Sequence, residues 1–385
     1  MDYGLLPAAL TLVSFGLMVW QWIEGRLFPL HRRARSRVYC PPVTLLKPLK
    51  GCDAATEDCL RSWLVQNYLG QTQCLFAVDS PDDPVCEIVR RLLTAHPEVH
   101  GALLVCPPRL GPNAKAAKLA EVLPHAKHDV LVISDADVKA PPDLLTNLVA
   151  PLQDPAVALV SPFYRNAEPA TMAMHCEAIA VNADFWTGVL QARRFGPLRF
   201  ALGAVMTVRR TAVEAIGGLG VLADYLADDY ELGRRVAHSG GRIELCPVAV
   251  DCCNAPHGWG EVWRHQLRWS RTIRACQPLA YGASIISNVT LWALLWVALA
   301  PGFPAGLGAA ACLLMRLLTA FDNQRRLGQS AAHIRWVWLA PLKDLCQAAW
   351  WALAFLGNRV EWRGRHFRVT RAGRLVSLDE PPASP

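Results

Sequence analysis

Two aspartates, Asp135 and Asp137, follow directly after an apolar run of strand length, Val130 to Ile133. Such a run predicts a buried parallel strand, and open α/β sheets bind ligands beyond the carboxyl ends of these strands. Mg²⁺ and Mn²⁺ prefer oxygen ligands, often one or two carboxylates together with substrate phosphates. The pattern therefore predicts a metal-assisted nucleotide-diphosphate site. The Asp-x-Asp tripeptide alone also fits a polar turn that caps the next helix.

The composition indicates a catalytic domain attached to membrane segments. Of 385 residues, 52% are hydrophobic and only 18% are charged, which is unusually apolar for a soluble enzyme. The net charge of +7 comes with arginines beside the apolar segments, which suits anionic lipid rather than nucleic acid. The thirteen cysteines are scattered without C-x-x-C pairs, which predicts reduced thiols in the cytoplasm.

The amino terminus predicts a membrane anchor. Tyr3 to Ile23 contains no charge and is long enough to cross about 30 Å of hydrocarbon as a helix. Residues 1–25 are therefore assigned to the anchor and residues 26–40 to a basic linker. By the positive-inside rule, the amino terminus lies outside and the linker begins in the cytoplasm.

Residues 41–256 alternate short apolar runs with helical stretches, which predicts an α/β domain with a mostly parallel sheet between helices. Asp79 ends a second predicted strand, residues 73–79, as Asp135 ends its own. The carboxyl ends of parallel strands share one edge of a sheet, so these carboxylates are expected to converge. Further along, the acidic run Asp228 to Glu231 opens a predicted helix, where acidic side chains also simply complement the helix dipole.

The remaining chain returns to the membrane. Tryptophans and arginines at helical spacing in residues 257–280 predict a helix in the membrane interface. Within the C-terminal membrane segments, residues 281–358, Tyr281 to Ala300 and Ala305 to Phe321 predict a helical hairpin with Arg316 snorkelling toward the interface. The basic stretch Asp322 to Arg335 is then expected to be a cytoplasmic loop.

The segment Trp336 to Gly357 has two interpretations, because it is long enough to span but contains Pro341, Lys343 and Asp344. It either spans or re-enters the membrane. Asp344 either approaches a lipid substrate or pairs structurally with Lys343. Residues 359–385 are assigned to a basic tail.

Six motifs carry a resemblance, in order: LLKPLKG, VDSPDDP, GPNAK, SDAD, ADDY and an Arg268-Trp269 pair. With this set the chain resembles the ceramide glucosyltransferase family, and is similar to a bacterial branch that acts in hopanoid biosynthesis. The resemblance implies a GT-A-type nucleotide-sugar domain anchored by N- and C-terminal transmembrane helices. It further implies an inverting transfer from a UDP-sugar, assisted by Mg²⁺ or Mn²⁺.

For the donor, the resemblance implies that Asp79 contacts uracil or ribose, and that Asp135 and Asp137 hold the metal beside the diphosphate. Lys115 either supports phosphate or base as a point charge, or is an ordinary solvated helix lysine. Gly203 is expected to let the backbone approach the sugar.

For the transfer itself, the resemblance implies that Asp229 is the catalytic base, which removes the acceptor hydroxyl proton. Arg268 and Trp269 are implied to contact the diphosphate and the acceptor. The family motif has Gln or Arg three residues before Arg268, whereas this chain has His265; either Gln266 substitutes for that residue or His265 donates instead.

The expected protein is a multi-pass membrane enzyme with a cytoplasmic catalytic domain, at a bacterial inner membrane, that glycosylates a lipid and binds no nucleic acid. The donor and acceptor are expected to be UDP-N-acetylglucosamine with a hopanoid polyol, or UDP-glucose with ceramide. Two alternatives stay open: a processive polysaccharide synthase, and an inactive lipid-binding scaffold on the same fold.

Overall fold

A computed structural model describes residues 4–34, 38–107, 109–329 and 334–379. The chain divides into two compact units. The sheet unit comprises residues 30–164 and 196–255, and the helical unit comprises residues 1–29, 165–195 and 256–385. Each unit is described by itself.

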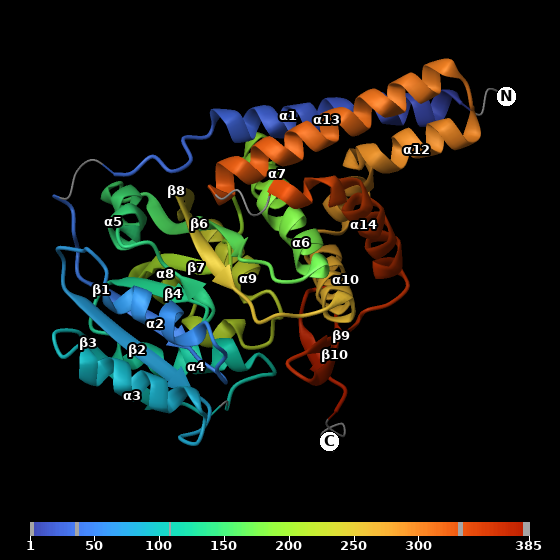
Figure 1. The fold of residues 1–385 in the computed structure, drawn as a ribbon. Helices are drawn as coiled ribbons and strands as arrows, with labels where there is room; N and C mark the ends of the chain where they lie inside the picture. The colour runs from blue at the N-terminus through green and yellow to red at the C-terminus, as the bar shows by residue number, and fades with distance from the viewer. Residues whose placement is uncertain (1–3, 35–37, 108, 330–333, 380–385) are drawn as a thin grey trace. The chain divides into compact units, whose positions relative to one another are not determined.

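The sheet unit is built on an eight-stranded sheet with the order β3-β2-β1-β4-β7-β6-β8-β5 (Figure 1). One half is parallel: β3 (His100–Val105), β2 (Thr72–Val78), β1 (Val43–Pro48) and β4 (Val130–Ser134). The other half contains antiparallel pairs and makes the sheet mixed; its strands are β7 (Val205–Arg209), β6 (Val157–Ala167), β8 (Arg242–Cys253) and β5 (Val138–Lys139). The predicted α/β class is confirmed.

The parallel half forms where the sequence is continuously apolar. Every residue of β1 and β4 is buried, as expected for strands covered on both faces. In the described part of the sheet unit, six α-helices accompany the strands: α2 (Thr56–Leu64), α3 (Val85–Ala95), α4 (Ala114–Val122), α5 (Leu144–Val149), α8 (Arg210–Ala215) and α9 (Asp228–His238). Strand β1 pairs with β2 on one side and β4 on the other, so the ends of β2 and β4 flank the same strand.

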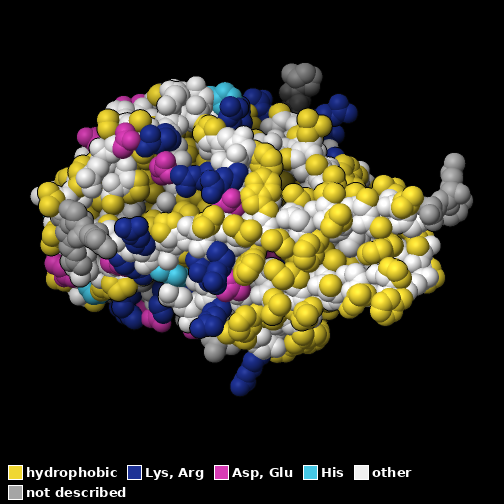
Figure 2. Space-filling view, turned by 90° about the horizontal axis from the view of Figure 1, so that it is seen from above, with side chains coloured by type: hydrophobic (Ala, Val, Ile, Leu, Met, Phe, Trp, Pro, Cys, Tyr) yellow, Lys and Arg dark blue, Asp and Glu magenta, His cyan; other side chains and the backbone are white. Residues whose placement is uncertain are grey.

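Among its described residues, the helical unit contains two single helices that are long and apolar enough to cross a membrane, α1 (Leu5–Leu27) and α13 (Phe303–Gly328). Figure 2 shows hydrophobic side chains gathered around these helices, with few charged side chains among them. Leu12 of α1 is 73% exposed and Leu307 of α13 is 61% exposed. Apolar surface of this kind is expected of helices that face lipid.

The predicted continuous span from Tyr281 to Ala300 is broken. The chain forms α11 (Pro278–Ser284), a short 3₁₀ turn and α12 (Val289–Leu299), with a 57° bend between the two parts. A new helix begins after Asn288, because the Asn288 side chain accepts a hydrogen bond from the Leu291 amide at 3.0 Å and so caps the amino terminus of α12. The pair is either one broken span or a re-entrant segment.

Arg316 does not snorkel, contrary to prediction. It is buried, and its guanidinium lies 2.8 Å from both Asp344 and Asp184. Lys343 pairs with the same two carboxylates, at 2.7 Å and 2.6 Å respectively. The paired interpretation of Lys343 and Asp344 is therefore confirmed. Arg316 and Lys343 thus neutralise Asp184 and Asp344 inside the unit. Because its charge is paired there, the Arg316 guanidinium does not have to reach water.

One further expectation for the C-terminal third is wrong. The stretch assigned to a basic loop continues α13 as far as Gly328; residues 330–333 of that stretch lie outside the described residues. Within the residues assigned to a basic tail, residues 359–377 contain a three-stranded antiparallel sheet, β9 (Arg359–Trp362), β10 (Arg365–Val369) and β11 (Leu375–Ser377); residues 380–385 lie outside the described residues. Between these two parts, α14 (Ala340–Phe355) has 16 residues, fewer than the roughly 20 that a perpendicular span requires.

We expect Arg316→Met to lower the free energy of unfolding by about 3–5 kcal/mol, because one cation would be lost from a buried cluster that needs both. Thermal unfolding in detergent measures the change. Arg325→Met is the matched control, since Arg325 is exposed on the same helix and should unfold within about 0.5 kcal/mol of the wild type. Equal melting temperatures for the two variants would contradict the structural role of Arg316.

Candidate active site

Lys115 gathers the carboxylates of the sheet unit. It lies in the first turn of α4 and is only 7% exposed. Its Nζ atom is 2.7 Å from Asp135 Oδ1 and 3.2 Å from Asp228 Oδ2. Burial disfavours the charged ammonium, but the two carboxylates more than offset that effect and raise the pKa of Lys115. The alternative of a solvated lysine is wrong.

The loop before α4 holds Lys115 in this position. Asn113 caps the helix by accepting hydrogen bonds from the Lys115 and Ala116 amides. The same side chain donates to the Tyr225 carbonyl at 2.7 Å, and the Asn113 amide donates to the Ala223 carbonyl. Because residues 223 and 225 precede α9, Asn113 fixes the start of α4 against the segment that leads to Asp228.

Asp135 and Asp137 lie beyond the carboxyl end of β4, as predicted. Burial raises the pKa of Asp137 to about 6, and the like charge of Asp135 adds to the effect. Lys47 of β1 contacts the same segment: its Nζ donates to the Asp135 carbonyl at 2.6 Å and to Ser134 Oγ at 3.1 Å. Desolvation lowers the pKa of this buried lysine to about 8. Lys47 was not singled out by the sequence analysis.

Two neighbouring carboxylates suit a Mg²⁺ or Mn²⁺ ion that takes its other ligands from diphosphate oxygens and water. In the part of the chain that the structure describes, no three His, Cys, Asp or Glu side chains are grouped to hold a metal by themselves. The mutual repulsion of Asp135 and Asp137 is relieved if a cation binds between them. The donor set thus fits an ion that binds together with a phosphate-bearing substrate.

Asp79 lies beyond the end of β2, on the other side of β1 from Asp135. Its Oδ1 atom is 2.9 Å from the Nζ of Lys118, a fully buried lysine on α4. Lys118 also donates to the Leu49 carbonyl at 2.7 Å. The two strand ends lie at the same edge of the sheet on either side of β1, and α4 supplies one lysine to each of them.

Asp229 occupies the first turn of α9, beside Asp228. Burial raises the pKa of Asp229 to about 6; Asp228 adds to the shift and Lys115 opposes it. Gly203 lies directly against this carboxylate, because a Cβ atom at that position would be 2.6 Å from Asp229 Oδ2. The lack of a side chain at residue 203 therefore makes room for the Asp229 carboxylate.

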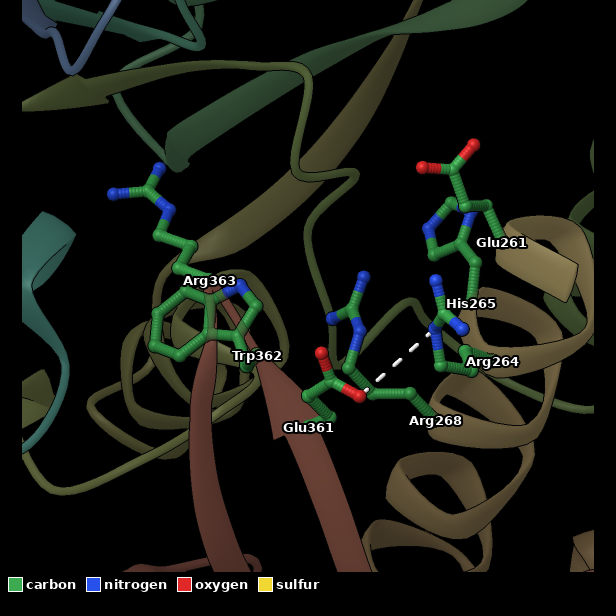
Figure 3. A pocket seen from close by; sticks show the side chains of 7 residues that line it. All are labelled: Glu261, Arg264, His265, Arg268, Glu361, Trp362 and Arg363. Carbon is green, nitrogen blue, oxygen red and sulfur yellow. Dashed lines mark ion pairs between the residues drawn. The ribbon is translucent and has the colours of Figure 1, made fainter. Parts of the chain in front are cut away.

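Arg268 and Trp269 belong to the helical unit, on α10 (Trp259–Cys276). Arg268 lines a pocket of about 230 Å³ together with residues of α10 and of the β9–β10 hairpin (Figure 3). Trp269 packs edge-on against His265, with ring centroids 4.5 Å apart.

Glu177 on α6 (Met172–Ile179) organises the start of α10 and was missed by the sequence analysis. It is 3% exposed, and it lies 2.7 Å from His265 Nδ1, 2.8 Å from Gln266 Nε2 and 3.3 Å from His257 Nε2. Burial acts against the carboxylate, but hydrogen bonds from these side chains hold the pKa of Glu177 at about 2. Both His265 and Gln266 thus contact the same buried acid. Its sequence signal is a lone carboxylate in a helix that is apolar except for His175.

The family comparison decides the class of protein. The family described as Glycosyl transferase family 21 matches residues 6–375. The chain belongs to this family. As a family 21 glycosyltransferase, it places the Asp-x-Asp carboxylates, Lys115 and Asp229 in the unit that carries the sheet.

Several characterised proteins are similar to this family 21 chain. Ceramide glucosyltransferase of Candida albicans is 36% identical over 121 residues, or 29% of this chain and 22% of that protein. Ceramide glucosyltransferase 1 of Caenorhabditis elegans is 24% identical over 58% of this chain and 47% of its own length. An N-acetylglucosaminyltransferase of Rhizobium leguminosarum is 22% identical over 60% and 55%. The matched regions span between about a fifth and just over half of these relatives.

A solved structure shares the fold. The mannosyltransferase PcManGT of Pyrobaculum calidifontis, in complex with GDP-Man and Mn²⁺, covers 90% of this chain and 98% of its own, with 21% identity and a TM-score of 0.53. The predicted GT-A-type fold is confirmed.

Proposed function

We propose that the chain transfers one sugar from a UDP-sugar to a hydroxyl group of a membrane lipid, with inversion at the anomeric carbon. The observation that carries the proposal is the pair of contacts from the Lys115 ammonium to Asp135 and Asp228. These contacts bring the strand-end acids and the α9 acids together around one cation, so that donor and acceptor chemistry can share a site.

In this proposal Asp229 removes the proton from the acceptor hydroxyl. The acceptor oxygen attacks the anomeric carbon from the face opposite the diphosphate, the bond from that carbon to the diphosphate oxygen breaks, and UDP leaves with the bonding electrons. A base with a pKa near 6 is deprotonated at neutral pH yet more basic than an ordinary aspartate. Asp228, beside it in the chain, pairs with Lys115 at 3.2 Å.

Asp135 and Asp137 would hold the Mg²⁺ or Mn²⁺ ion, which supplies Lewis-acid stabilisation of the departing diphosphate when bound. Lys115 and Lys118 add positive charge at the same edge of the sheet. Asp79 is proposed to contact the uracil or the ribose by accepting a hydrogen bond. In the helical unit, Arg268 and Trp269 are proposed to contact the diphosphate and the acceptor.

Apolar helices in the same chain support a lipid acceptor, as do the relatives named for ceramide glucosylation. The two donor and acceptor pairs proposed are UDP-N-acetylglucosamine with a hopanoid polyol and UDP-glucose with ceramide. The catalytic unit is proposed to face the cytoplasm, at a bacterial inner membrane. A processive synthase is the second candidate. The two or three candidate spans among the described residues favour single transfer over a polymer-export channel.

The testing experiment supplies membranes that contain the protein with labelled UDP-glucose or UDP-N-acetylglucosamine and with ceramide, diacylglycerol or bacteriohopanetetrol. We expect one labelled glycolipid carrying a single sugar. A polymer would favour the processive synthase. Absence of any product and of UDP release with every pair would favour an inactive scaffold.

Gly203→Ala is expected to lower the rate of transfer by about a hundredfold, because the new methyl group would displace the Asp229 carboxylate and misplaced catalytic groups cost about that much. Initial rates under donor saturation measure the effect. Gly188→Ala is the control, since a Cβ atom at that helical position meets nothing within 4 Å. Full activity in Gly203→Ala would contradict the assigned contact.

The rate of transfer is expected to fall as the pH drops through about 6. Asp229 must be unprotonated to accept a proton, and its raised pKa moves this requirement upward from the ordinary aspartate range. The plateau should therefore lie above pH 7. Measuring kcat between pH 5 and pH 8 shows where the rate falls on the acidic side. A kcat unchanged down to pH 5 would exclude a base of this pKa.

A further inference from the structure

In the pocket of the helical unit, the positively charged side chains outnumber the negatively charged ones. It is lined by three arginines and two glutamates, with His265 and Trp362: Arg264, Arg268, Arg363, Glu261 and Glu361. Glu261 accepts a hydrogen bond from the Gly258 amide and so caps α10. Glu361 lies 3.9 Å from Arg264, which is beyond hydrogen-bonding distance.

Two guanidinium groups in this pocket are not ion-paired with any carboxylate of the described residues. Within the described ranges, neither Arg268 nor Arg363 forms an ion pair, although both line the same cavity. Burial lowers the pKa of Arg268 to about 10; Glu177 opposes this effect and the like charge of Arg363 adds to it. Two arginines that repel each other across a cavity are stabilised when an anion binds between them.

Arg363 lies in the tight turn between β9 and β10. Trp362 pairs with Arg365, so that Arg363 and Gly364 form a two-residue turn with φ values of 53° and 74°. Such turns favour Asn-Gly or Gly-Gly, and a long side chain at positive φ is strained. Strain of this kind is typically kept where a side chain has a function.

The hairpin is also fastened to α10. Arg271 donates to the Arg359 carbonyl and Arg274 donates to the Gly357 carbonyl at 3.1 Å. Arg264, His265 and Arg268 project from α10, and Glu361, Trp362 and Arg363 from the hairpin (Figure 3). The Arg363 guanidinium carbon lies 5.4 Å from the centre of the Trp362 ring, which supports it by a cation–π contact.

We propose that this pocket binds a phosphate group, and that Arg363 and Trp362 of the C-terminal hairpin complete the site together with Arg268. Planar guanidinium groups recognise phosphate oxygens in pairs of hydrogen bonds. Two sources share this chemistry: the diphosphate of the sugar nucleotide, in which case the inference rests on the proposed function, and the headgroup of an anionic phospholipid. The hairpin thus becomes a ligand-binding element.

Binding of three probes to the full chain in neutral detergent tests this proposal by titration calorimetry. The probes are inorganic pyrophosphate, dihexanoyl phosphatidylglycerol and the zwitterionic dihexanoyl phosphatidylcholine. We expect Arg363→Gln to weaken pyrophosphate or phosphatidylglycerol binding about tenfold, as Arg268→Gln does, and Arg363→Lys to weaken it less. Arg371→Gln is the matched control, because Arg371 is exposed in the turn between β10 and β11, outside the pocket.

The outcomes separate the two sources. If the two pocket variants lose affinity for pyrophosphate only, the pocket binds the diphosphate of the sugar nucleotide. If they lose affinity for phosphatidylglycerol only, the pocket binds a phospholipid headgroup of the bilayer. The proposal is overturned if Arg363→Gln and Arg268→Gln, with unchanged melting temperatures, bind every probe as Arg371→Gln does. The calorimetry measures binding and not sugar transfer. A chain that fails to transfer sugar would therefore contradict the proposed function without contradicting phosphate binding in this pocket.

Discussion

Asp229→Asn is expected to lower the rate of sugar transfer about a thousandfold, with the donor KM changed only a few-fold. Asparagine keeps the shape of the side chain but cannot accept the acceptor proton, and a positioned general base contributes about 10²–10⁴ in rate. Removing a charge beside Asp228 should not disrupt the fold, because Asp228 keeps its contact with Lys115. Steady-state release of UDP and formation of glycolipid measure both parameters.

The control for this variant is Asp224→Asn, which makes the same chemical change at an exposed residue five positions earlier. Its activity should match the wild type within about twofold. Transfer at the wild-type rate by Asp229→Asn would remove Asp229 from the role of base. A large rise in KM without loss of kcat would instead make it a binding residue.

Lys115→Met is expected to reduce the free energy of unfolding by about 3–5 kcal/mol and to abolish transfer. The methionine fits the space of the lysine, but it leaves Asp228 as a buried carboxylate without its cation and releases Asp135 from its contact at 2.7 Å. For a domain of this size, the change corresponds to a fall of roughly 10 °C in melting temperature. Differential scanning fluorimetry in detergent detects it.

A double variant separates stability from activity at this site. Lys115→Met with Asp228→Asn removes both charges of the buried pair and should recover much of the lost stability, but not the transfer. Lys127→Met is the matched control, since Lys127 is exposed near the other end of the same helical segment. Normal stability in Lys115→Met would mean that the ammonium does not organise the carboxylates.

The strand-end acids could be predicted from sequence because their signal is local. A continuous apolar run such as β4 identifies a strand buried on both faces, and the parallel order brings its end to the same edge of the sheet as the end of β2, with β1 between them. The roles assigned to Asp79, Asp135, Asp137 and Asp229 remain predictions, as do those of Arg268 and Trp269.

The partners of these acids could not be predicted, because each pairing joins distant parts of the chain. Lys115 is 113 residues before Asp228, and Arg316 is 132 residues from Asp184. A lysine on a helix and an arginine in an apolar segment look solvated when only near neighbours are considered. Glu177 was missed for the same reason: its three partners lie at least 80 residues away.

The membrane segments were predicted by length and hydropathy, and the errors follow from that method. Length and hydropathy give no signal that a new helix begins after Asn288. The segment from Tyr281 to Ala300 was therefore predicted as one continuous span. Charge counting likewise treated the carboxyl terminus as a tail, although alternating residues such as Val360, Phe367 and Val369 are buried within a small sheet.

The central claim is that Asp135 and Asp229 act on one substrate in different roles. Electron paramagnetic resonance of Mn²⁺, titrated with and without UDP, measures this directly in Asp135→Asn and Asp229→Asn alongside transfer. We expect Asp229→Asn to retain UDP-dependent binding of Mn²⁺ while losing transfer, and Asp135→Asn to lose both. Unchanged Mn²⁺ binding in Asp135→Asn, or wild-type transfer in Asp229→Asn, would contradict the claim.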